Sequence, residues 1–137
     1  MDNSTVIGTA LRSTLLADPQ IAELVGGNRI YFIQAPQQAT FPYILYAYAG
    51  GGKDNNSAKG GFDVYMGIKA IAQTQTQARF IAGLINEALD EKYLTFTEGF
   101  EAFAPVTEQE PILQVTDVQT VQYWSAGHVY RIRAARI

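Results

Sequence analysis

The order of local signals in Thr9–Tyr46 constrains the fold more than any other stretch of this chain. Apolar residues at helical spacing end before Asp18-Pro19, where aspartate caps a new helix and proline suits its first turn. Gly26-Gly27 ends that second helix, because glycine adopts the positive φ found at helix ends. An apolar run, a loop with Pro36 and an aromatic run then follow. The segment predicts two helices followed by two strands.

The rest of the chain predicts one long helix and several strands. Alternating apolar residues in Phe62–Ala72 predict a strand, and a helix capped by Thr74 or Thr76 continues as far as Glu91. The other predicted strands are Arg29–Ile33, Tyr43–Tyr48, Tyr93–Phe96, Ala102–Val106, Leu113–Trp124 and His128–Arg136, with a tight turn at Ser125–Gly127. Consecutive strands with short connections pair antiparallel. We therefore predict an α+β fold over residues 1–137 as a single domain, with an antiparallel sheet of about four to six strands and helices packed on one face.

Composition narrows the class of protein. Apolar residues make up 47% and charged residues 17% of the 137 positions, which is typical of a folded chain and excludes disorder. The net charge of −3 does not indicate the basic surface that a DNA-binding protein usually presents. There is no cysteine, and no apolar run reaches the length of a membrane span. The start of the chain does not resemble a signal peptide, so we expect synthesis in a cytoplasm and no membrane partner.

No residue pattern predicts catalysis. His128 is the only histidine, so it lacks the partners that a metal site or a catalytic triad needs. Gly50–Lys53 resembles a phosphate-binding loop only superficially, because alanine stands where the first glycine belongs and Asp54 follows the lysine. Acidic residues after Glu98 show no calcium-loop spacing. We predict no enzyme activity, no cofactor and no metal site.

Charge is unevenly distributed along the chain. Glu87–Asp117 holds eight acidic residues and one lysine, whereas Arg131, Arg133 and Arg136 close the chain without an acid among them. Unlike charges on two regions predict contact between copies, although two solvated surfaces explain the pattern equally well. The candidate interface residues are Lys53, Asp54, Asn55, Asn56 and Lys59 in the glycine-rich loop, with Glu98, Glu101, Glu108, Glu110, Arg131, Arg133 and Arg136.

The chain resembles the phage tail-completion family, also called tail-terminator, minor tail or head–tail joining proteins. The resemblance covers roughly Thr9–Phe96. Its motifs are Ala17-Asp18, Leu24-Val25-Gly26-Gly27, Arg29-Ile30-Tyr31, Ala35-Pro36 and Pro42-Tyr43-Ile44, followed by the strand Phe62–Ala72 and the helix Thr76–Glu91. Each motif has a structural role as a cap, a helix stop or a strand start, so together they indicate a fold rather than a catalytic site.

The resemblance implies a structural protein of the virion, located at the head-proximal end of the tail. Such proteins form a ring, usually with six subunits, that ends tail-tube polymerisation and offers a surface to head-completion proteins. The implied partners are further copies of the chain, the tail-tube protein and the head-completion or connector protein, while DNA passes through the lumen without specific binding. Two alternatives stay open: another neck component such as a head-completion connector, and a small ligand-binding or enzymatic α+β domain.

Overall fold

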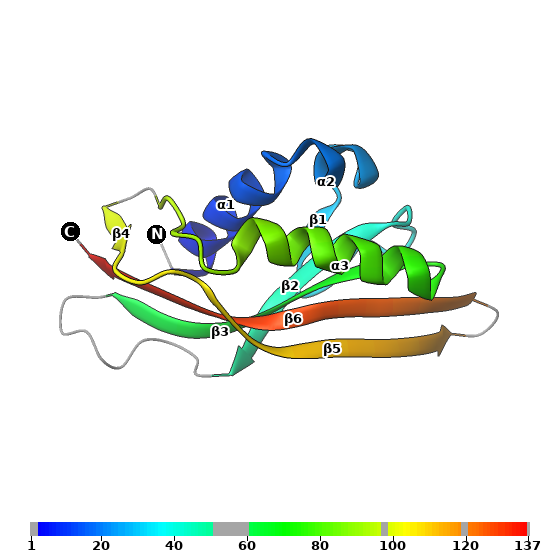
Figure 1. Cartoon of the computed structure of the whole chain (residues 1–137). Helices are drawn as coiled ribbons and strands as arrows, with labels where there is room; N and C mark the ends of the chain where they lie inside the picture. The colour runs from blue at the N-terminus through cyan, green and yellow to red at the C-terminus, as the bar shows by residue number, and fades with distance from the viewer. Residues whose placement is uncertain (1–2, 51–60, 97–98, 119–120, 137) are drawn as a thin grey trace.

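A computed structural model of the chain describes residues 3–50, 61–96, 99–118 and 121–136 (Figure 1). Within these ranges the elements, in chain order, are α1 (Asn3–Leu16), α2 (Pro19–Leu24), β1 (Ile30–Phe32), β2 (Tyr43–Gly50), β3 (Phe62–Ala72), α3 (Gln75–Leu89), β4 (Phe100–Ala102), β5 (Thr107–Val118) and β6 (Val121–Arg136). The fold is α+β, which confirms the prediction. No helix in the described ranges has both the length and the hydropathy needed to cross a bilayer.

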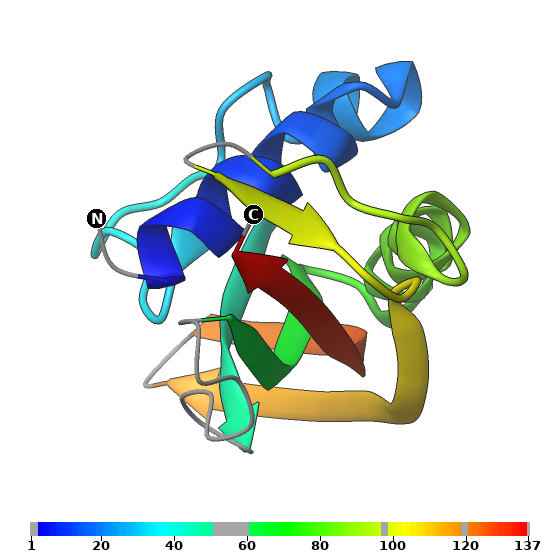
Figure 2. The same cartoon turned by 90° about the vertical axis from the view of Figure 1, so that its left-hand side faces the viewer.

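One mostly antiparallel sheet contains all six strands. The order is β1-β2-β3-β6-β4, and β5 also pairs with β6. The 16-residue β6 has β3 along one edge, whereas its other edge pairs first with β5 and then, at its end, with β4. The sheet is curled, so that β4 and the end of β6 rise toward α1 (Figure 2). The long central strand therefore holds both halves of the sheet together.

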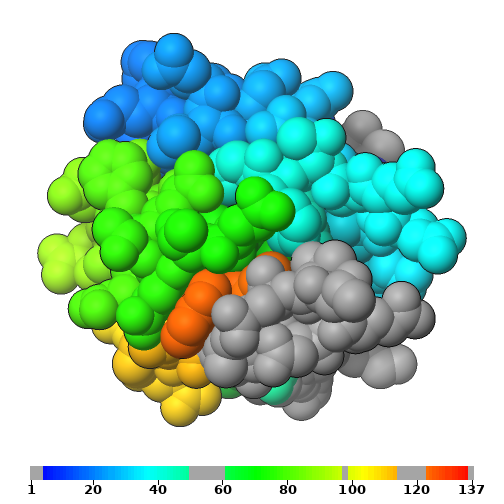
Figure 3. Space-filling view, turned by 90° about the vertical axis from the view of Figure 1, so that its right-hand side faces the viewer, coloured from blue at the N-terminus to red at the C-terminus, as the bar shows by residue number. Residues whose placement is uncertain are grey.

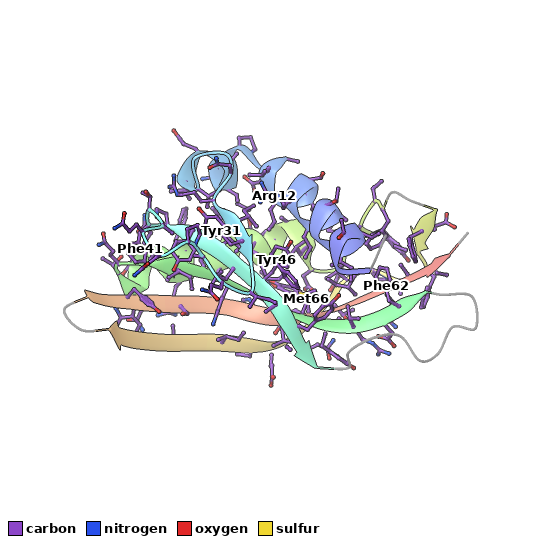
Figure 4. All side chains as sticks on the ribbon, turned by 180° about the vertical axis from the view of Figure 1, so that it is seen from behind. Arg12, Tyr31, Phe41, Tyr46, Phe62 and Met66 are labelled. Atoms are coloured by element: carbon purple, nitrogen blue, oxygen red, sulfur yellow. The ribbon has the colours of Figure 1, made fainter. Side chains whose placement is uncertain are left out.

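All three helices lie on one side of the sheet (Figure 1). Alternate residues of β3, from Phe62 to Ala70, are buried toward the helices, as the period of two predicts. Figure 4 shows Tyr46, Met66 and Phe62 on this side of the sheet. They pack with the apolar stripes of α1 and α3 in one continuous core. No described helix covers the opposite face of the sheet.

Local chemistry explains where α2 and α3 begin. The Asp18 carboxylate accepts a hydrogen bond from the Gln20 amide at 2.9 Å, and Pro19 occupies the first helical position. The Thr74 hydroxyl accepts from the Gln77 amide at 3.2 Å and caps α3. These starts were predicted because the capping residues act only on their own neighbours in sequence.

The predicted turn at Ser125–Gly127 is wrong, because these residues lie inside β6. Ser125 and Ala126 are buried, and Ala126 packs against alanines of β3 and α3. A side chain at Gly127 would collide with the backbone oxygen of Ile68 and lie 2.5 Å from the Lys69 Cα atom. The small residues allow close packing of β6, whose first residue, Val121, pairs antiparallel with Val118 of β5.

Other differences from the predictions come from contacts distant in sequence. β1 and β2 pair in parallel rather than antiparallel, since the intervening loop brings the chain back to the same end of the sheet. The guanidinium of Arg29 donates to the carbonyls of Leu24 and Pro42, each at 3.1 Å, and so stabilises the loop between β1 and β2. Tyr93–Phe96 is not a strand, and β4 begins at Phe100 rather than at Ala102.

Candidate functional site

The helix-free face of the sheet carries an ion pair between β3 and β6. Arg131 donates from Nε to Asp63 Oδ1 at 2.9 Å and from Nη2 to Oδ2 at 2.6 Å. The Arg131 guanidinium also lies 5.8 Å from the centroid of the Tyr65 ring, its direct neighbour on β3. Hydrogen bonds from Arg131 lower the pKa of the Asp63 carboxyl, although burial opposes this effect. The pair therefore keeps Asp63 charged and fixes one of the two arginines.

Arg133 stands directly opposite Asp63 in the strand register, yet Arg131 takes both carboxylate oxygens. The Nε atom of Arg133 is buried and has no hydrogen-bond acceptor. A buried donor without an acceptor costs on the order of 1–3 kcal/mol. This face therefore holds two arginines and one aspartate in adjacent positions, and the Nε atom of Arg133 still lacks an acceptor.

An apolar hollow of about 180 Å³ lies on the same face, farther along β3 than the ion pair. Its floor consists of small residues, Ala47 and Ala49 on β2 and Gly67 on β3. Ile112 of β5 reaches across to form one wall, with its Cδ1 atom 3.7 Å from where a Cβ of Gly67 would stand. The face is thus apolar on one side and charged on the other, as in a surface that another protein covers.

The other side of the sheet carries acidic residues where α3 ends and β5 begins. Asp90 accepts a hydrogen bond from the backbone amide of Glu108 at 2.9 Å, which holds the end of α3 against the start of β5. Exposed Glu87 and Glu91 lie on the neighbouring turns of the chain. Burial raises the pKa of the Tyr130 hydroxyl, and the charges of Asp90 and Glu108 raise it further. This acidic surface faces away from the Asp63–Arg131 pair.

A second hollow, of about 470 Å³, opens between α3 and the strands β5 and β6. Ala82 and Gly83 of α3 line it on one side, Leu113 of β5 on another, and Arg79 and His128 supply its polar groups. Figure 3 shows the green surface of α3 directly beside the orange of β6 at this end of the molecule. The large share of small and apolar residues suits a protein side chain better than a polar metabolite.

The structure brings together only some of the candidate interface residues. Arg131 and Arg133 share the helix-free face, as their alternation predicts. The two glutamates of β5 do not share one surface. Glu108 pairs with Tyr130, whereas Glu110, beyond a bulge in β5, pairs with Val129. Glu101 is exposed on β4, and Arg136 ends β6 opposite Phe100. The remaining candidates, Lys53, Asp54, Asn55, Asn56, Lys59 and Glu98, lie outside the described residues.

Sequence reasoning assigned no interaction to Asp63 and did not predict the hollow beside His128. The Asp63–Arg131 contact joins residues 68 positions apart, and only a correct pairing of β3 with β6 would have found it. The Nδ1 atom of His128 lies 3.5 Å from the hydroxyl oxygen of Tyr130, and His128 also lines the hollow. Within the described ranges no group of three acidic or histidine side chains is arranged to hold a metal ion.

We expect the Asp63–Arg131 pair to make folding depend on pH. Because the folded state lowers the pKa of Asp63, the pair stabilises the fold fully above the ordinary carboxyl pKa, and this contribution is lost as the pH falls through the lowered value. Replacing Asp63 with asparagine should cost about 1 kcal/mol of unfolding free energy near pH 7, since the pair is partly exposed. Urea unfolding from about pH 7 to pH 2 measures the difference.

The matched control for this experiment is Glu101→Gln, which removes an exposed carboxylate from β4. Its unfolding free energy should follow the wild-type pH curve closely. The difference in unfolding free energy between wild type and Asp63→Asn should shrink as the pH falls. A difference that stayed constant down to the lowest pH would show that the two hydrogen bonds to the charged carboxylate are not its cause.

Comparison with known proteins shows which family has this sequence pattern and this fold. The model of the family described as tail completion protein gp17 matches residues 9–125. A search of curated proteins finds no match. Among solved structures, a chain from the "virion of native gene transfer agent (GTA) particle" superposes with a TM-score of 0.73 at 18% identity, over 96% of each chain. The fold is thus shared across nearly the whole length of both chains. The protein belongs to the tail completion protein gp17 family and is a structural protein of the phage tail.

Proposed function

We propose that copies of this chain form a closed, hexameric ring at the head-proximal end of the phage tail. The ring ends polymerisation of the tail tube and presents a surface to the head-completion protein. Family membership supports a role in tail completion. The solved chain with the same fold comes from a virion particle, which agrees with a location in the virion.

The observation that carries this proposal is the presence of unlike surfaces on opposite sides of one sheet. A ring requires a heterologous contact, in which one surface of each subunit meets a different surface of the next. The helix-free face offers Arg133, whose Nε lacks an acceptor, and an apolar hollow. The other side offers the acids around Asp90 and Glu108. Such a subunit has different surfaces for different neighbours.

We assign the charged candidate residues to these contacts in the assembled tail. Arg131, Arg133 and Arg136 belong to the arginine-bearing strand, while Glu101, Glu108 and Glu110 belong to β4 and β5. The proposed set is completed by Glu98 and by the loop residues Lys53, Asp54, Asn55, Asn56 and Lys59. A ring of net acidic subunits also suits the passage of DNA, because the lumen then repels phosphate rather than holding it.

The proposed role is structural and requires no reaction chemistry. Asp63 is bound by Arg131, and the Tyr130 hydroxyl donates to Asn86. The hollow on the helix-free face and the hollow between α3, β5 and β6 are lined mainly by small and apolar side chains rather than by converging polar groups. These contacts support a protein whose polar groups stabilise a fold and its assembly.

Electron microscopy of tails from a phage lacking this gene tests the proposal. We expect tail tubes of uncontrolled length that do not join heads, because nothing ends tube growth. Expression of the wild-type chain in the same host should restore both length and joining. Tails of normal length that lack only the head joint would overturn the proposal and favour a head-completion connector instead.

A further inference from the structure

One end of the molecule presents an exposed aromatic side chain next to an acid. Phe103 follows the last residue of β4, and 59% of its surface is exposed. Glu101, two residues earlier, is exposed as well. β4 lies near both chain termini, at the far left of Figure 1. Apolar surface left in water forfeits the free energy of burial, so a partner that covered Phe103 would gain from it.

The hollow between α3, β5 and β6 has the complementary properties. Its volume of about 470 Å³ exceeds that of a phenyl ring, and Leu113, half exposed, leaves an apolar wall open to solvent. Arg79 is exposed at its edge, and no described acid forms an ion pair with it. The hollow lies toward the end where α3 begins and the β5–β6 hairpin extends, away from β4 (Figures 1 and 3).

We propose that Phe103 of one copy inserts into this hollow of the next copy, with its Glu101 beside the neighbour's Arg79. This inference rests on the proposed ring and adds to its unlike sides a contact between the two ends of the molecule. The aromatic group and the hollow lie toward different ends of one molecule, so the contact is head-to-tail and repeats from copy to copy. An aromatic anchor in a small-residue pocket, flanked by one pair of opposite charges, has the composition of an interface hot spot.

Disulfide trapping in assembled tails tests this contact, because the chain has no cysteine of its own. Ala104→Cys places a thiol beside Phe103 without removing the ring. Gly83→Cys places another in the hollow, where a Cβ meets no atom within 4 Å. Oxidation of tails that contain the double variant should give a ladder of dimers, trimers and larger species on non-reducing gels, whereas each single variant should stay monomeric.

A matched pair controls for chance proximity. Ala104→Cys combined with Glu23→Cys, an exposed position on α2, should give no ladder. Dimers from either single variant would show a symmetric contact and overturn the inference, as would a double variant without a ladder. The proposed function fails separately, if deleting the gene leaves tail length unchanged.

Charge substitution gives an independent measurement. Phe103→Glu should lower the incorporation of the chain into tails at least tenfold, because a carboxylate cannot enter an apolar hollow beside Leu113 without losing its hydration. Phe80→Glu makes the same change at a similarly exposed phenylalanine of α3, outside the lining of the hollow, and should leave incorporation unchanged. Equal incorporation of both variants would also overturn the inference.

Discussion

Replacing Gly127 with alanine should destabilise the fold by about 3 kcal/mol or more, the largest loss expected from adding one methyl group to this chain. A Cβ atom there would collide with the Ile68 backbone oxygen and lie 2.5 Å from Lys69 Cα and 2.8 Å from Lys69 Cβ. Backbone atoms in the middle of the sheet cannot move aside unless β3 separates from β6. Urea unfolding followed by circular dichroism measures the cost.

Gly83→Ala is the matched control for that substitution. Gly83 is exposed on α3, and an added Cβ would meet no atom within 4 Å. Alanine also loses less conformational entropy than glycine in a helix, so this variant should be more stable by about 0.5–1 kcal/mol. The same methyl group thus has opposite effects at two positions. A Gly127→Ala variant as stable as wild type would show that β3 and β6 are farther apart than the structure places them.

Gly127 also shows why part of the sheet escaped prediction. In sequence, Ser125–Gly127 has the composition of a turn, whereas in the structure small side chains are needed where β6 passes close to β3 and α3. By contrast, α2, β3 and α3 were predicted with nearly correct ends. The signals for these elements are the helix caps Asp18 and Thr74 and the alternation in Phe62–Ala72. Each signal depends on residues close together in sequence, whereas strand pairing depends on residues far apart.

The interaction surfaces, too, could be predicted only where the signal is local in sequence. The alternation of Arg131 and Arg133 places both on one face from sequence alone, but the partner of Arg131 comes from β3. The run of acids suggested a single negative region. A bulge in β5 next to Gln109 and the alternation of the strand instead distribute Glu108 and Glu110 to different neighbours on β6. Sequence therefore identified charged segments, and only the register shows which charges share a surface.

Tyr130 connects the core to the acidic side of the sheet. It is fully buried in β6, between Met66 of β3 and Glu108 of β5 in the register, and its hydroxyl donates to Asn86 Oδ1 at 2.9 Å. Burial, with the charges of Asp90 and Glu108, raises the pKa of this hydroxyl. The folded state therefore favours the neutral phenol, and its stabilisation is present below the ordinary tyrosine pKa of about 10 and lost as the pH rises toward the raised value.

Two substitutions separate the ring of Tyr130 from its hydroxyl. Tyr130→Ala should cost about 3–5 kcal/mol, because it leaves a cavity under α3, whereas Tyr130→Phe should cost only about 1 kcal/mol through the lost hydrogen bond to Asn86. Tyr130→Phe should also lose less stability than wild type above about pH 10, since it has no phenol to ionise. Tyr93→Ala, at a side chain that is 65% exposed, should stay within about 0.5 kcal/mol of wild type. Equal losses for the alanine and phenylalanine variants would mean that the hydroxyl, not the ring, supplies the stability, and that the core beneath α3 tolerates a cavity.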